Sequence, residues 1–130
     1  MENQRIGVCS VCDEPIHYKY PCRCRREKPR VITLCGSTRF KREFEEVNKN
    51  LTLQGNLVIS VGVFGHSEGI QLSEQEKQML DNIHLRKIDM ADEIYVINFG
   101  GYIGSSTKNE IEYAKATGKE IRYHDEKAVN

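Results

Sequence analysis

The chain has 130 residues, a length that predicts one domain with a modest core and room for a small extra segment. Lysine plus arginine (19) equals aspartate plus glutamate (19), so the formal net charge is zero. This balance argues against binding to nucleic-acid polymers or membrane surfaces, which depends on excess positive charge. No apolar run approaches the ~20 residues of a membrane-spanning helix, and no signal-peptide pattern opens the chain. We therefore expect a cytoplasmic protein with a small-molecule partner.

The first 29 residues are rich in cysteine and basic residues, and they contain two pairs of closely spaced cysteines. In a reducing compartment such clusters are more often metal ligands than disulfides. Four thiolates suit the tetrahedral coordination of zinc and leave no open position for catalysis. We therefore predict a zinc-ribbon-like segment over residues 1–29 with a structural zinc ion, whose ligands are Cys9, Cys12, Cys22 and Cys24. Two alternatives remain open: His17 replaces one thiol, or the segment is a reduced tail without metal.

Pro29 closes this segment, and alternating strands and helices follow it. Apolar runs predict strands at 31–35, 57–61, 94–97 and 121–123. The first predicted helix has an apolar stripe of Phe40, Phe44, Val47 and Leu51, begins at Ser37 or Thr38 as N-cap, and ends near Gly55.

The second predicted helix opens with a capping box, in which Ser73 and Glu76 satisfy each other's backbone amides. Its predicted apolar stripe consists of Met79, Leu80, Ile83 and Ile88. The third predicted helix runs from Thr107 to a C-terminal glycine at Gly118.

Strand–helix alternation predicts an α/β fold, a three-layer domain with a small parallel sheet covered on both faces. We assign residues 30–124 to this domain and 125–130 to a loose tail. Ligands of such folds bind outside the carboxyl ends of the strands. The loops 36–39, 62–72 and 98–107 all follow strands and are expected to meet there.

Two of these loops carry glycine and hydroxyl residues at a strand-to-helix junction, which suits a phosphate or sugar. In the first, Gly36 permits close approach, Ser37 and Thr38 donate hydrogen bonds, and Arg39 can fork onto phosphate oxygens. An ordinary glycine turn followed by an N-cap would use the same residues. In the second loop, Gly104, Ser105 and Ser106 precede the third helix.

Glu110 follows the second loop and is expected in the first helical turn, facing whatever the loop holds. A capping box with Thr107 is the competing interpretation, since Thr-x-x-Glu matches that motif. Cys35 ends an apolar strand and is expected to be a buried small hydrophobe. His66 and His84 have no partner in view, so a loop and a helix-surface role are expected for them.

Three motifs in the right order resemble the nucleoside 2-deoxyribosyltransferase superfamily, which includes nucleotide N-glycosidases. The resemblance covers about residues 30–124 and does not include the cysteine-rich start. The motifs are Leu34-Cys35-Gly36-Ser37-Thr38-Arg39, then Ala91-Asp92-Glu93-Ile94-Tyr95-Val96-Ile97-Asn98, then the Gly-rich loop into Asn109-Glu110-Ile111-Glu112-Tyr113-Ala114. It implies a Rossmann-like domain, a homodimer or higher homo-oligomer, and cleavage of the bond between base and sugar C1′, with no organic cofactor.

Residue by residue, the resemblance makes Glu110 the nucleophile. It places Gly36, Ser37, Ser105 and Ser106 around a 5′-phosphate, Asn98 near the sugar, and Phe64 and His66 over the base. The segment before the glutamate, Ser-Ser-Thr-Lys-Asn, departs from the pattern of many relatives, which bears on the sugar that fits.

We therefore expect a nucleotide N-glycosidase or deoxyribosyltransferase that acts on a (deoxy)nucleoside monophosphate. An ionised glutamate would attack C1′ through an oxocarbenium-like transition state, and water or another base would accept the sugar. Two alternatives are a non-catalytic nucleotide-binding module and an enzyme that cleaves NAD or an ADP-ribose relative.

Overall fold

The computed structural model describes residues 5–17, 19, 20, 22, 24 and 28–128. Its main part is an α/β domain around a parallel four-stranded sheet with the strand order β4-β3-β5-β6. The strands are β3 (Val31–Gly36), β4 (Leu57–Ile59), β5 (Glu93–Ile97) and β6 (Glu120–Tyr123). The helices are α1 (Lys41–Leu53), α2 (Gly65–Glu68), α3 (Glu74–Asp89) and α4 (Ser105–Ala116), with the short 3-10 turns η2 (Phe99–Gly101) and η3 (Glu126–Ala128). The predicted fold class is confirmed.

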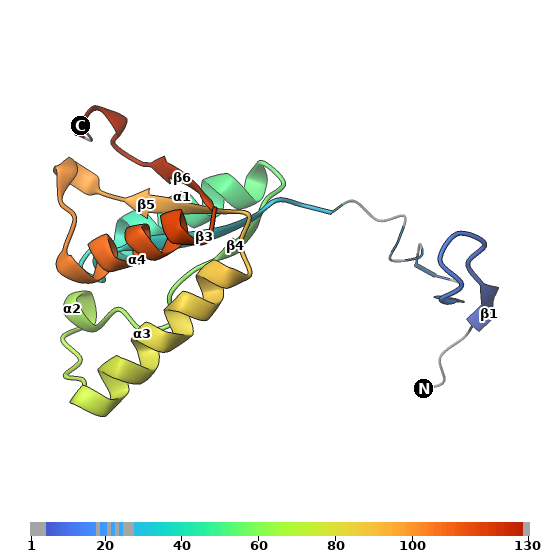
Figure 1. The fold of residues 1–130 in the computed structure, drawn as a ribbon, viewed down its shortest axis with the longest axis horizontal. Helices are drawn as coiled ribbons and strands as arrows, with labels where there is room; N and C mark the ends of the chain where they lie inside the picture. The colour runs from blue at the N-terminus through green and yellow to red at the C-terminus, as the bar shows by residue number, and fades with distance from the viewer. Residues whose placement is uncertain (1–4, 18, 21, 23, 25–27, 129–130) are drawn as a thin grey trace.

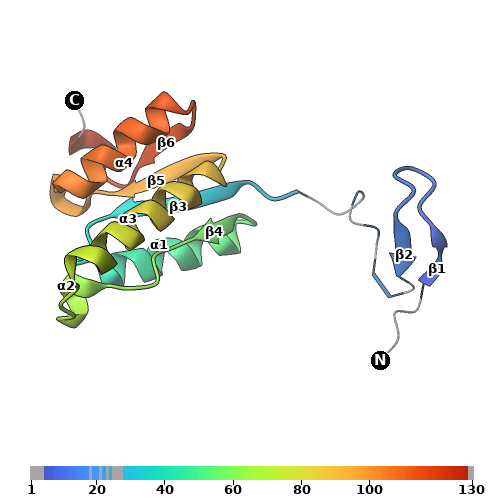
Figure 2. The ribbon, with the colours of Figure 1, turned by 60° about the horizontal axis from the view of Figure 1, so that its bottom comes forward.

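The sheet separates α1 from the pair α3 and α4, and Figures 1 and 2 show these three layers. Side chains alternate across β3 and β5, so each strand contributes to two cores. The core on the α1 side consists of Ile32, Leu34, Phe44, Val47, Leu51 and Ile97. The core on the α3 and α4 side consists of Cys35, Ile88, Ile94, Val96, Ile111 and Ala114.

All four strands are parallel, but the side of the sheet on which the chain adds the next strand changes between β3 and β5. The chain passes from β3 outward to β4, then crosses back over the sheet through α3 to β5 on the other side of β3. The loops that leave β3 and β5 therefore diverge to opposite faces at the carboxyl ends of adjacent strands. In open α/β sheets such a point is where ligands bind.

Two predicted helix starts are wrong. The N-cap of α1 is Phe40 and not Ser37 or Thr38, because a turn closed by Phe40 N–H donating to the Ser37 carbonyl comes first. The N-cap of α4 is Gly104 and not Thr107, which lies in the first helical turn with a buried side chain. The capping box of Ser73 and Glu76 is confirmed, with both reciprocal hydrogen bonds present at the start of α3.

The buried stripe of α3 also differs from the prediction. Met79 and Ile83 are 52% and 43% exposed, whereas His84 and Ile88 are buried. The stripe that meets the sheet is therefore rotated by one position and carries a histidine. This rotation brings His84 against β3 and α4.

The cysteine-rich segment forms a small antiparallel hairpin of β1 (Arg5–Val8) and β2 (Pro15–His17). The hairpin stands apart from the sheet in Figures 1 and 2. The far end of the chain continues past β6 into η3, and the backbone of Asp125 is hydrogen-bonded to the Asn98 side chain. Within the described residues, no helix combines the length and the apolar composition that crossing a membrane requires.

Candidate functional site

A cavity of about 510 Å³ opens where the loops after β3 and β5 diverge. Both predicted phosphate loops line it, and so do α2, α3 and α4. Its polar lining includes Gly36, Ser37, Thr38, Arg39, His66, Gly104, Ser105, Ser106 and Glu110. Its apolar lining consists of Val61, Val63, Ile70, Leu72, Leu80 and Ile83. The cavity thus joins a hydrogen-bonding end with an apolar wall, which is typical of small-ligand sites.

The loop after β3 is held in place by contacts that leave its donors at the cavity. A Cβ atom on Gly36 would lie 2.9 Å from the carbonyl oxygen of Ile97, so only glycine lets β3 and β5 converge here. Thr38 Oγ1 lies 2.6 Å from Nδ1 of His66, which ties α2 to this loop. The Arg39 guanidinium stacks over the Tyr102 ring at 4.3 Å and donates to its hydroxyl.

The loop after β5 ends in a helix start whose amides are open to the cavity. Lys108 N–H is the first to donate within α4, to the carbonyl of Gly104. The amides of Ser105, Ser106 and Thr107 therefore have no acceptor within the helix. In the described structure no side chain caps this end, since its N-cap is glycine. These amides and the positive end of the helix dipole favour an anionic group.

Glu110 extends from the second turn of α4 into the same cavity. Its side chain is 16% exposed, and its Oε1 lies 3.4 Å from Nε2 of His84. Among the described residues, this buried oxygen has no hydrogen-bond partner. The competing capping-box interpretation is wrong, because the helix begins at Ser105 and Glu110 does not contact its N-cap. The carboxyl group is available for a ligand.

Burial sets the protonation of this cluster. It raises the pKa of Glu110 to about 8, and the charge of Asp81 adds to the effect. Burial also lowers the pKa of His84 to about 4, and the charge of Lys87 adds to that. With the cavity empty at neutral pH, Glu110 is therefore mostly the neutral acid and His84 the neutral imidazole. The sequence-based expectation of an ionised glutamate requires a step that removes this proton.

The stability of the protein should depend on the charge of Glu110. The folded protein keeps the Glu110 proton up to about pH 8, whereas the unfolded chain loses it near pH 4.5, so this group lowers the free energy of unfolding as pH rises through that window. His84 has the opposite effect: between about pH 4 and 6.5 it raises the free energy of unfolding as pH rises, because the unfolded chain binds the proton that the folded protein has lost. We expect Glu110→Gln to be a few kcal/mol more stable than the wild type at pH 9, since a buried charge is removed. Urea unfolding at pH 5, 7 and 9 measures this; parallel pH curves for the two proteins would refute it.

Two further residues, His84 and Cys35, belong to this cluster but are not among the predicted site residues. His84 was expected on the helix surface, but it is 8% exposed and lies 3.2 Å from the Cys35 sulfur. Cys35 is fully buried as expected, and burial raises its pKa well above the usual range. A signal for His84 was present in the sequence: it lies four residues from both Leu80 and Ile88, on one helix face.

Two predicted substrate-binding residues do not line the cavity. Phe64 packs on the α1-side core, with its ring 5.3 Å from that of Phe44. Asn98 is fully buried, and its side-chain amide donates to and accepts from the backbone of Asp125. The other predicted residues, Gly36, Ser37, Arg39, His66, Gly104, Ser105, Ser106 and Glu110, are brought together.

The sulfur atoms of the four N-terminal cysteines all lie within 4.8 Å of one another. Cys9 and Cys24 sulfurs lie 3.6 Å apart, and the Cys22 sulfur lies 3.5 Å from both Cys12 and Cys24. Four sulfurs placed ~2.3 Å from a zinc ion lie about 3.8 Å from one another, which these separations approach. All four cysteines are free, so the cluster can bind a metal. The side chain of His17 lies outside the described residues.

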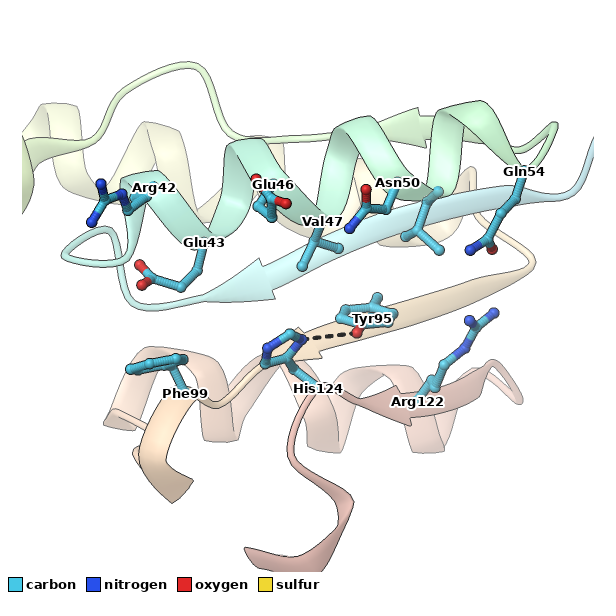
Figure 3. A pocket seen from close by; sticks show the side chains of 11 residues that line it. Arg42, Glu43, Glu46, Val47, Asn50, Gln54, Tyr95, Phe99, Arg122 and His124 are labelled. Atoms are coloured by element: carbon cyan, nitrogen blue, oxygen red, sulfur yellow. Dashed lines mark hydrogen bonds between the residues drawn. The ribbon is translucent and has the colours of Figure 1, made fainter.

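A second cavity, of about 440 Å³, lies between α1 and the face of β5 and β6 (Figure 3). Side chains of α1, among them Glu43, Glu46 and Asn50, face Tyr95 and His124 across it. Tyr95 and His124 are hydrogen-bonded at 3.0 Å, and Arg122 is paired with Glu93. Three of its polar side chains, Tyr95, His124 and Arg122, are thus partnered within the protein, and the cavity contains none of the predicted site residues.

A family model described as "Domain of unknown function (DUF4406)" matches residues 33–123. The match covers more than half of the chain and contains every residue that lines the 510 Å³ cavity. It leaves the cysteine hairpin outside. No curated protein matches the chain.

Proposed function

The chain belongs to the DUF4406 family, and we propose that it cleaves the N-glycosidic bond of a (deoxy)nucleoside monophosphate with Glu110 as the nucleophile. One observation carries the proposal. A buried carboxyl group with an unpartnered oxygen lies in the same cavity as the donor groups of two phosphate-type loops. Buried polar atoms are normally satisfied, so an orphaned carboxyl oxygen suggests a role toward a ligand.

The two ends of the cavity suit the two ends of a nucleotide. The amides at the start of α4, the Ser37 hydroxyl and the Arg39 guanidinium would bind a 5′-phosphate. The apolar wall formed by α3 and the loop before it would bury the flat base. Phosphate binding would orient C1′ against the Glu110 carboxylate, so that remote binding energy lowers the barrier.

In the reaction, a Glu110 oxygen bonds to C1′ as the bond to the base breaks, through an oxocarbenium-like transition state. Water then hydrolyses the glycosyl ester, or a second base accepts the sugar. The cysteine cluster has a separate role in this proposal: it binds a structural zinc ion, since four thiolates leave no open coordination position.

A second candidate is a nucleotide-binding module without catalysis. The observation in its favour is the raised pKa of Glu110, because a neutral carboxylic acid can donate a hydrogen bond to a bound ligand. Binding without turnover would then be the whole activity.

The test is incubation with ribo- and deoxynucleoside 5′-monophosphates, the corresponding nucleosides, and NAD, followed by chromatography for free base. We expect base release from a 5′-monophosphate, with kcat/KM at least about tenfold lower for the nucleoside that lacks the phosphate. Arg39→Gln should raise KM for the monophosphate alone, and the exposed Arg42→Gln on α1 serves as its matched control. Nicotinamide release from NAD would favour an enzyme that cleaves NAD or an ADP-ribose relative. Binding without release of base would favour the non-catalytic nucleotide-binding module.

A further inference from the structure

One imidazole nitrogen at the bottom of the cavity faces two acidic groups. Nε2 of His84, on α3, lies 3.2 Å from the sulfur of Cys35 and 3.4 Å from Oε1 of Glu110. The three groups come from three different elements, β3, α3 and α4, and all are largely buried. Burying three polar groups is costly unless they satisfy one another, so this contact has to be explained.

Cys35 and His84 are both neutral near pH 7, so the imidazole tautomer sets which atom donates. The buried Cys35 thiol keeps its proton, because burial raises its pKa. The tautomer of the ring decides whether the thiol or Nε2 donates in this contact, and the tautomer with its proton on Nδ1 leaves a lone pair on Nε2 that can accept. In that tautomer the lone pair is available to Glu110, whose Oε1 lies 3.4 Å from Nε2 and whose carboxyl group holds a proton when the cavity is empty. A proton acceptor therefore lies beside the one acidic group that must ionise for the proposed reaction.

We propose that His84 is a positioning residue that holds the Glu110 carboxyl group toward the cavity and accepts its proton when that group attacks the sugar. The inference rests on the proposed function of Glu110 and adds the source of its charge. Cys35 keeps the imidazole in the orientation that this transfer requires.

The step is balanced in protons and electrons. As a Glu110 oxygen bonds to C1′, its proton moves to Nε2 of His84 and the electron pair of the C1′–N bond leaves with the base. The base takes a proton from water. Hydrolysis of the glycosyl ester by a second water restores the acid form of Glu110, and the proton on His84 neutralises the hydroxide left by the first water. The net reaction consumes one water and leaves both residues unchanged.

Other charged groups around the cavity set the direction of this transfer. Besides Glu110 and His84, the titratable or charged residues that line it are Arg39, His66, Lys77, Asp81, Lys87 and Tyr102. Burial and then the charge of Asp81 hold the proton on Glu110, and burial and then the charge of Lys87 disfavour it on His84, so the empty site keeps the proton on the acid. A bound dianionic phosphate raises the pKa of both groups, so the bond that the Glu110 oxygen forms to C1′ is what makes its proton acidic enough to move to His84.

The test is the pH dependence of base release in His84→Gln, which keeps a polar group but cannot hold the proton. At pH 6.5 we expect kcat to fall about 30-fold with KM changed little, since about 3% of Glu110 is ionised there. The loss should shrink roughly tenfold per pH unit up to about pH 8, where Glu110 ionises without an acceptor. The wild type should change much less over this range. His124→Gln, on the exposed face of the second cavity, is the matched control. A loss in His84→Gln that is the same at pH 6.5 and 8.5 would overturn the inference.

A second measurement needs neither turnover nor a folded His84 variant. Nitrogen NMR of the wild-type imidazoles, without substrate, should show Nε2 of His84 unprotonated at pH 7 and its signal shifted in Glu110→Gln. If the His84 signal shifts in Glu110→Gln but the protein releases no base from any nucleotide, the proposed function is rejected. The interaction between His84 and Glu110 is then still supported. An unchanged His84 signal in Glu110→Gln, or a protonated Nε2, would reject the inference itself.

Discussion

Glu110→Gln is expected to abolish detectable base release, with a loss in kcat of at least about 1,000-fold, while nucleotide affinity stays within a few-fold of the wild type. The amide cannot form the ester to C1′, so the covalent route is closed. The phosphate donors of both loops are untouched, and glutamine has nearly the shape of the neutral acid that occupies the empty site. Chromatography for free base and calorimetric titration with the same nucleotide measure the two effects.

Glu112→Gln is the matched control, because Glu112 is on the same helix but exposed and outside the cavity. It should retain wild-type turnover. Full base release in Glu110→Gln would show that another group performs the attack. A parallel loss of binding and turnover would instead assign Glu110 to substrate binding.

Zinc removal should affect the hairpin and leave the α/β domain folded. The protein purified under reducing conditions is expected to contain about one zinc ion per chain, and Cys12→Ser should lose most of it. The domain should keep its thermal midpoint, since neither hydrophobic core includes any of the four ligand cysteines. Elemental analysis, with Cys35→Ser as the control that keeps its zinc, and thermal unfolding of Cys12→Ser against the wild type measure this. A zinc content near zero in the wild type would disprove the metal assignment.

The fold could be predicted because each strand and helix has its own local signal. Strands β3 and β5 are buried on both faces, so their sequences are nearly continuous apolar runs. In α1, Phe44, Val47 and Leu51 repeat at helical spacing. The start of α3 was placed correctly because its capping box satisfies backbone groups within one turn, independent of the rest of the chain.

The helix starts at the site were not predictable in the same way. Ser37 and Thr38 were expected to cap α1, but Thr38 is hydrogen-bonded to His66, which is 28 residues away. Thr107 was expected to cap α4, but it is buried in the domain instead. Hydroxyl residues satisfy a local motif in isolation, and a distant partner decides whether they do so in the folded protein.

The largest gap between sequence and structure concerns His84. Its position on the buried face of α3 was visible, but a histidine there is compatible with many roles until its partners are known. Those partners, Cys35 and Glu110, lie on β3 and α4, and only the return of the chain across the sheet joins them. The carboxyl group was thus identified from its motif, while its protonation had to come from the three-dimensional structure.

The most direct test of the central claim is a search for the sugar on Glu110. A nucleoside monophosphate with fluorine at the 2-position of the sugar should release its base once per site and then stall, because fluorine slows the second oxocarbenium-like step. After acid quenching and digestion, mass spectrometry should place a fluorinated sugar phosphate on the Glu110 carboxyl group. Release of one equivalent of base with every Glu110 peptide unmodified would contradict the account.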